Sequence, residues 1–348
     1  MLGNFTVPVL LGSIALSNPI TNQPNEYKLV ENLQGANLTR AFNWETGGGW
    51  DNGGIPLYVD AIQARRNGLW TVLPPATTTG QNVFRVDARP NVDGPYRMST
   101  RISTKKNYSG GGLFVFDVAH IPTGYGLWPA LWMVGVPNWP SQGEIDVIEG
   151  VHMTTMNTQS YHTTMGCSMQ RTGFTNLFTL AGDLKYDCDA YAADNQGCST
   201  RDTSTISYGA PFNAQGGGVF AVLWNYEGIA MYTFPRNAVP ADITSGTPQV
   251  LDWGTPTAFL SNTNCSIFDN FYEMKIVINS NLCGSWAGSV WNDDLSYAGS
   301  PGSPASKTRS KTCEAYIKTG GFHALREAYW TINSIKIYNT TLDWDDAS

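Results

Sequence analysis

Charged side chains are scarce in this sequence. Asp, Glu, Lys and Arg make up 14% of the 348 residues, the formal net charge is −7 and the pI is near 5.1. No basic run occurs, because the pair Lys105-Lys106 stands alone. Nucleic acids attract proteins that carry a basic surface. The composition therefore excludes nucleic acid as the expected partner.

Cysteine is absent from the first 166 residues, and the chain contains only four histidines. None of the six cysteines forms a CxxC pair, so no zinc site is expected. An even number of cysteines in a polar, loop-rich chain instead predicts three disulfides, although the spacing leaves their pairing open. The cysteines are residues 167, 188, 198, 265, 283 and 313.

Long hydrophobic runs are also missing. Residues 5–16 form a mostly apolar stretch that is too short to span a bilayer, and small residues end it. We expect residues 1–17 to be a signal peptide, although its basic start is lacking and an interior strand is the alternative. The polar last six residues give no lipid-anchor signal. Secretion without a membrane anchor is expected, and five glycosylation sequons agree with it, at Asn4, Asn37, Asn107, Asn264 and Asn339.

Helical periodicity is scarce and no internal repeat is present, whereas glycine (36 residues) and aromatic residues (12%) are plentiful. Short β-type runs separated by turn residues predict an all-β fold. We expect a two-sheet antiparallel β-jelly-roll sandwich, forming one domain over residues 18–348 with a concave substrate cleft. Residues 43–54 and 296–312 are expected to be irregular loops. The predicted strands are residues 58–63, 98–104, 112–120, 128–134, 144–149, 159–163, 218–224, 229–234, 275–279 and 329–338.

The most informative segment is residues 143–150, with the sequence GEIDVIEG. Its β-branched residues predict a strand, in which Glu144 and Asp146 share one face. Strict alternation would turn Glu149 to the other face. A β-bulge at residues 147–148 would bring Glu149 back, and bulges are common beside active sites.

Four effective strand steps separate Glu144 from Glu149, or about 13 Å between Cα atoms, and their side chains can bring the carboxyls to roughly 5 Å. This is the spacing of a retaining glycosidase, with one carboxylate as nucleophile and the other as acid/base. Asp146 between them would tune both pKa values. A solvated acidic strand or a calcium site is the alternative interpretation.

Tryptophans precede the acidic strand. Alternation places Trp128 and Trp132 on one face, and Trp139 stands five residues before Glu144. We expect Trp128 to lie in the core, and Trp132 and Trp139 to stack on sugar.

These motifs resemble glycoside hydrolase family 16, and within it the fungal laminarinase-type endo-1,3(4)-β-glucanases. The resemblance extends from about residue 27 to residue 338, and the six-residue Glu-x-Asp-x-x-Glu form is that of the laminarinases. It rests on GLWPALW (126–132), Trp139-Pro140 and GEIDVIEG (143–150), and on the blocks FDVAHIP (116–122), NAQGGG (213–218), FPR (234–236), WGTPTAF (253–259), NTNC (262–265) and LCGSWAG (282–288).

The resemblance implies roles for the acidic strand and the tryptophans. Glu144 would be the nucleophile, Asp146 its helper and Glu149 the general acid/base. Trp132 and Trp139 would line the donor-side subsites.

Three further positions match the family. Trp286 would stack on sugar, although Ser285 stands where the family has Asp. Arg101 would contact sugar hydroxyls, with a surface charge as the alternative. His162 would donate a hydrogen bond that orients Glu149, with a core histidine as the alternative.

The resemblance implies a secreted, monomeric endo-glucanase that cleaves β-1,3-glucan, and mixed β-1,3-1,4-glucan as a second substrate, with retention of configuration. No cofactor is expected, and no ligand loop demands the structural calcium that some family members bind. A cell-wall transglycosylase using the same carboxylates and a non-catalytic glucan-binding lectin are the two alternatives.

Overall fold

The computed structural model describes residues 18–21, 27–48, 52–73, 80–92, 94–180, 182–192 and 194–340. The expected signal peptide, residues 1–17, lies outside the described residues. Within the part of the chain that the structure describes, the helices are too short or too polar to cross a membrane.

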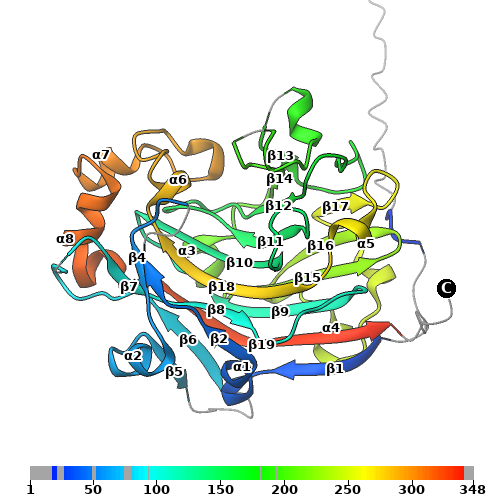
Figure 1. Ribbon diagram of the computed structural model, residues 1–348, viewed down its shortest axis with the longest axis horizontal. Helices are drawn as coiled ribbons and strands as arrows, with labels where there is room; N and C mark the ends of the chain where they lie inside the picture. Colours follow the sequence, from blue (N-terminus) through cyan, green and yellow to red (C-terminus); the bar gives the residue numbers. More distant parts are fainter. Residues whose placement is uncertain are drawn as a thin grey trace, which may run out of the picture.

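Two large antiparallel sheets lie face to face (Figure 1). Sheet A has the strand order β17 (Ala258–Ser261), β16 (Gly228–Pro235), β15 (Gly218–Asn225), β9 (Gly112–His120), β19 (Tyr329–Thr340), β6 (Gln81–Arg85) and β5 (Trp70–Leu73), with β1 (Tyr27–Leu33) also paired to β19. Sheet B has the order β13 (Leu177–Phe178), β14 (Cys198–Arg201), β12 (Thr158–His162), β11 (Glu144–Glu149), β10 (Leu127–Gly135), β18 (Met274–Leu282), β8 (Arg101–Thr104) and β2 (Phe42–Trp44). This two-layer sandwich confirms the predicted fold class.

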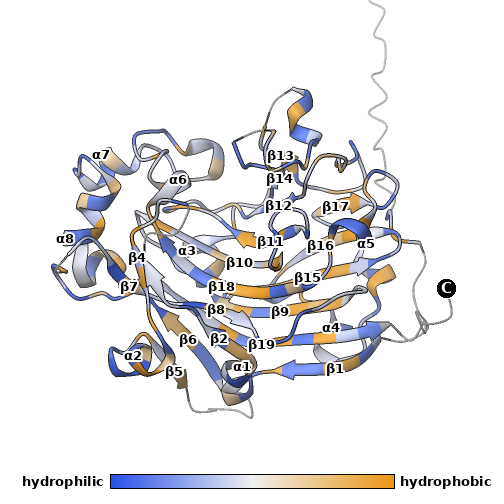
Figure 2. Ribbon diagram, viewed as in Figure 1, coloured by the Kyte–Doolittle hydropathy of each residue, from blue (hydrophilic) through white to orange (hydrophobic). Residues whose placement is uncertain are grey.

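The core lies between the two sheets and is built from alternating apolar residues (Figure 2). On β11, the side chains of Ile145, Val147 and Ile148 are fully buried in it. Each such aliphatic side chain stabilises the fold by about 1.5–3 kcal/mol on burial. Polar contacts also join the layers: the Tyr161 hydroxyl of β12 donates to the Ile229 carbonyl of β16 at 2.9 Å, and Trp330 Nε1 of β19 donates to the Asn279 carbonyl of β18 at 3.0 Å. The side chains on the inward face of β11 therefore pack in the core, and the opposite face carries the polar side chains.

Short helices and a small third sheet surround the sandwich. The third sheet joins β3 (Gly47–Gly48), β4 (Pro56–Tyr58) and β7 (Arg97–Ser99). The α-helices are α1 (Gly35–Ala41), α2 (Ala61–Arg66), α3 (Gly209–Ala214), α4 (Ala241–Ser245), α5 (Ile267–Asn270), α6 (Gly284–Ala287), α7 (Pro304–Thr308) and α8 (Cys313–Leu325). The 3-10 helices are η1 (Asp183–Tyr186), η2 (Arg236–Ala238), η3 (Val250–Trp253) and η4 (Ser296–Ala298).

Three segment predictions were wrong. Residues 58–63 form the end of β4 and the start of α2, because the Asp60 carboxylate caps the helix by accepting the Gln63 N–H at 2.8 Å. Residues 43–54 contain strand residues of β2 and β3, and residues 296–312 contain η4 and α7. The secondary structure of these segments depends on strand pairing and on a helix cap, and a pattern of apolar residues predicts neither.

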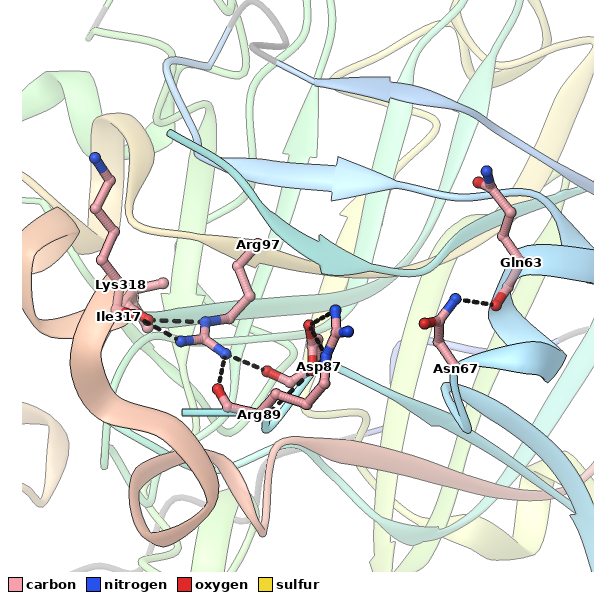
Figure 3. A network of polar contacts seen from close by, with 7 residues as sticks. All are labelled: Gln63, Asn67, Asp87, Arg89, Arg97, Ile317 and Lys318. Carbon is pink, nitrogen blue, oxygen red and sulfur yellow. Dashed lines mark hydrogen bonds and ion pairs between the residues drawn. The ribbon is translucent and has the colours of Figure 1, made fainter. Parts of the chain in front are cut away.

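The buried guanidinium of Arg97 ties α8 to β7 (Figure 3). Its side chain is 1% exposed and donates to four backbone carbonyls. The acceptors are Ile317 at 2.8 Å, Lys318 at 3.0 Å, Asp87 at 2.7 Å and Arg89 at 2.8 Å. Because every contact is to backbone, this arginine has a structural role.

Three disulfides are present, which confirms the prediction from the cysteine count. Cys188–Cys198 closes the loop that leads into β14, Cys283–Cys313 joins the end of β18 to α8, and Cys167–Cys265 links two loops.

Candidate active site

A β-bulge in β11 brings the three carboxylates to one face. Across β10, Trp132 pairs with Asp146 and Leu131 pairs with Ile148, so that Val147 has no partner. The pairing with β12 shifts over the same residues. The bulge predicted at residues 147–148 is therefore confirmed, and Glu149 returns to the face that Glu144 and Asp146 occupy.

Asn157 holds this bulge and was missed in the sequence analysis. Its side-chain nitrogen donates to the Val147 carbonyl at 2.9 Å, and its side-chain oxygen accepts the backbone N–H of Glu149 at 3.0 Å. The side chain is fully buried. Both backbone groups that the bulge removes from the ladder are thereby satisfied. No sequence signal distinguishes this asparagine, because it precedes β12 in an ordinary polar stretch.

Each carboxylate has a fixed partner. Trp139 Nε1 donates to Glu144 Oε2 at 2.5 Å, and Trp128 Nε1 donates to Glu149 Oε1 at 2.7 Å. The expectation that Trp128 lies in the core was wrong, because alternation places it on the acidic face with its indole N–H toward Glu149. These bonds orient the two carboxyls that were predicted to act together.

His162 contacts Asp146, with Nε2 at 3.1 Å from Oδ2. The expected hydrogen bond to Glu149 is not formed, because the strand register sets His162 opposite Glu144 and sets Thr158 opposite Glu149. His162 is 7% exposed and belongs to the site through the central aspartate.

Burial and mutual repulsion raise the carboxyl pKa values. Burial raises the pKa of Glu144 to about 8, and the charge of Asp146 adds to this rise. Burial also raises the pKa of Asp146 to about 7. The pKa of Glu149 lies well above its ordinary value, chiefly through burial and then through the charge of Asp146. The three groups therefore resist ionising together, and Glu149 tends to keep its proton.

Trp132 and Arg101 lie on the same side of the acidic strand. Trp132 Nε1 donates to Asn279 Oδ1 at 2.7 Å, and the Arg101 guanidinium carbon lies 5.1 Å from the centre of the Trp132 ring. Arg101 Nε also donates to Glu45 Oε2 at 2.6 Å. Arg101 is therefore part of this polar face rather than an isolated surface charge, and Glu45 is a further member that the sequence analysis missed.

Trp286 contacts Trp128, whose indole N–H donates to Glu149. The rings of Trp286 and Trp128 make an edge contact, with centroids 5.9 Å apart. At Ser285, the backbone N–H donates to the Asn52 carbonyl at 2.7 Å while the side chain is exposed. The structure thus brings Trp286 to the Glu149 end of β11, and brings Trp139 to the Glu144 end.

Glu144, Asp146 and His162 form the one group among the described residues that could hold a metal ion, with ligand atoms within 4.8 Å of one another. Asp146 and His162 already contact each other, and Glu144 accepts from Trp139.

Residues 42–338 match a family model described as the XgeA-like, catalytic GH16 domain. The chain is 39% identical over 327 residues to a probable endo-1,3(4)-beta-glucanase of Aspergillus clavatus, covering 93% of this chain and 48% of that protein. The chain spans about half the length of the curated relatives it matches.

Two solved structures are also similar. GH16 laminarinase 16A of Phanerochaete chrysosporium, with two beta-glucans in its donor and acceptor sites, has a TM-score of 0.78 and 35% identity, covering 90% of this chain and 99% of that one. An elongating GH family 16 beta-1,3-glucosyltransferase has a TM-score of 0.77 and 33% identity, covering 90% and 100%. The jelly-roll sandwich, the bulged acidic strand and these similarities agree: the chain belongs to glycoside hydrolase family 16 and contains its catalytic domain.

Proposed function

We propose that this protein is an endo-acting glycosidase that hydrolyses β-1,3-glucan with retention of configuration. The observation that carries the proposal is the pair Glu144 and Glu149 on one strand face, each held by an indole N–H. The related fungal proteins named endo-1,3(4)-beta-glucanases support glucan as the substrate class.

In the first step, a carboxylate oxygen of Glu144 bonds to the anomeric carbon while the bond from that carbon to the leaving oxygen breaks. Glu149 gives its proton to the leaving oxygen, and a glycosyl ester on Glu144 results. In the second step, Glu149 takes a proton from water as the water oxygen bonds to the anomeric carbon. Glu144 departs as a carboxylate, and two inversions restore the original configuration.

The surroundings of the carboxyls suit these roles. Reaction requires an ionised Glu144 and a protonated Glu149. Burial raises the pKa of Glu144 to about 8, although the charge of His162 and the hydrogen bond from Trp139 both lower it, so the ionised form that the reaction requires becomes more populated as pH rises toward 8. Burial and the charge of Asp146 hold the proton on Glu149. No step requires a cofactor or a calcium ion.

The rest of the proposal concerns substrate range and location. Trp132, Trp139 and Arg101 would hold the donor sugars, by stacking and by hydrogen bonds to hydroxyls. Mixed β-1,3-1,4-glucan is the second expected substrate. The three disulfides support secretion of the protein, and we expect a monomer.

The test is product analysis by mass and NMR on laminarin, lichenan and carboxymethyl-cellulose. Short products from laminarin that first appear as the β-anomer would support a retaining β-1,3-glucanase. Products longer than a laminari-oligosaccharide substrate would favour a transglycosylase, the alternative supported by similarity to the elongating glucosyltransferase. Glucan binding without new reducing ends would show a lectin and contradict the proposal.

A further inference from the structure

The strand order of sheet B divides the polar face into two sides. β10, β18 and β8 lie on one side of β11, and they carry Trp132 and Arg101. β12 and β14 lie on the other side. If the donor sugars of the proposed substrate lie over Trp132 and Arg101, a glucan that crosses the strands must place its leaving portion over β12 and β14.

On that side, Arg201 of β14 lies directly across β12 from Glu149, the proposed acid/base. Glu149 pairs with Thr158, and Thr158 pairs with Arg201, so the three side chains share one face. Two strand spacings separate Glu149 from Arg201, or about 10 Å. A sugar leaving from Glu149 toward β14 would reach the guanidinium within a short oligosaccharide.

The Nε–H of Arg201 is buried and has no hydrogen-bond partner. The guanidinium carbon lies 4.8 Å from the ring centre of Tyr297. Arg97 offers a comparison, because its Nε bonds to a backbone carbonyl and its other nitrogens bond to three more. A buried donor without a partner destabilises the folded state, so Arg201 differs from a purely structural arginine.

Tyr297 is presented by a well-anchored turn. Its side chain is 53% exposed, whereas Leu295 and Ala298 on either side are 1% and 4% exposed. The Ala298 carbonyl accepts the Thr155 N–H at 3.0 Å, and Asp294 Oδ1 accepts from Gly302 N–H at 2.8 Å. The turn therefore holds a large aromatic ring in solvent beside Arg201.

We propose that Arg201 and Tyr297 form an acceptor-side subsite for the glucan chain that leaves from, or returns to, Glu149. The free part of the Tyr297 ring packs on the apolar face of a glucosyl unit, and the Nη atoms of Arg201, rather than its buried Nε, donate to the hydroxyls of that unit. The subsite rests on the proposed function, and it governs how long the leaving chain remains available to compete with water for the glycosyl ester.

The test compares two substrates in Tyr297→Ala. One is a laminari-oligosaccharide that extends well beyond the scissile bond, and the other is an aryl laminari-oligoside whose leaving group is a single aromatic ring. We expect kcat/KM for the long substrate to fall roughly three- to tenfold relative to the aryl substrate. The yield of transfer products at a fixed acceptor concentration should fall in parallel.

Tyr297→Phe keeps the ring and should retain the wild-type ratio, whereas Arg201→Lys should lower it by loss of the planar fork. Tyr226→Ala is the matched control, because Tyr226 is 50% exposed and lies in the turn between β15 and β16 of sheet A. Equal losses on both substrates, or none on either, would overturn the subsite. A wild-type protein that cleaves neither substrate would instead overturn the proposed function.

Discussion

The backbone N–H of Glu149 donates to the side chain of Asn157 at 3.0 Å, so a buried amide determines where the acid/base candidate stands. The same amide donates to the Val147 carbonyl, and it therefore spans the bulge. Glu149 reaches the strand face of Glu144 only because the bulge accommodates Val147 as an extra residue without a partner on β10.

Asn157→Ala should lower kcat by more than tenfold while KM changes little, because the bulge loses both of its side-chain hydrogen bonds and Glu149 moves. The measurement is steady-state kinetics on laminarin, at a temperature where circular dichroism shows the variant folded. Ser207→Ala removes a hydroxyl that accepts the Asn157 backbone N–H and donates to the Ser204 carbonyl. It keeps both side-chain hydrogen bonds of Asn157 and should retain most of the activity. A fully active Asn157→Ala variant would show that the bulge persists without the two side-chain hydrogen bonds of Asn157.

Glu144→Gln should abolish turnover, because the amide cannot form the glycosyl ester, while glucan binding remains. Reducing-end assays and binding to insoluble glucan measure the two properties. Retention of more than a few per cent of activity would contradict the assignment of the nucleophile.

The same substitution should stabilise the protein as pH rises. Burial raises the folded-state pKa of Glu144 from 4.5 to about 8. Its contribution to stability is therefore fully present below the unfolded-state value and is lost as pH rises through about 8. The glutamine variant lacks this loss, so its Tm should exceed that of the wild type by a few degrees at about pH 8, and the difference should shrink toward about pH 4.5. Thermal unfolding across this range measures it; a pH-independent difference would contradict it.

Trp128→Phe should move the basic limb of the pH–rate profile to higher pH. The indole N–H donates to Glu149 and lowers the pKa of its carboxyl, so loss of the bond raises that pKa and Glu149 keeps its proton longer. Trp132→Phe is the control, because its indole bonds to Asn279 instead. The profile of kcat/KM on laminarin distinguishes the two variants, and a basic limb that moves equally in both would argue against the role given to Trp128.

Arg97→Met should lower the free energy of unfolding by about 3–5 kcal/mol, because four backbone carbonyls, two of them in buried contacts, lose a charged donor. Arg326→Ala should cost less than about 1 kcal/mol, because the Arg326 side chain is 63% exposed and lies 3.5 Å from Glu327, which is itself 46% exposed. Urea unfolding of both variants provides the comparison. Similar losses in the two variants would mean that the four hydrogen bonds of Arg97 contribute little to the free energy of unfolding.

The acidic strand was predictable from local chemistry. Alternation places Glu144 and Asp146 together, and the bulge that returns Glu149 to them follows from the expectation that all three acids belong to one site. Runs of β-branched and aromatic residues likewise indicated most of the sandwich strands. The start of α2 was missed because a single carboxylate cap at Asp60 outweighs a short apolar run.

By itself, the sequence determined that Glu144 and Asp146 share a strand face, because strand periodicity is a local property of the backbone. Only the tertiary structure decided three contacts. His162 contacts Asp146, Asn157 donates a hydrogen bond to the Val147 carbonyl in the bulge, and Tyr297 lies beside Arg201. Each of these contacts joins different strands or loops. Their register is set by the packing of two whole sheets and by the anchoring of loops, so spacing along one segment does not encode them.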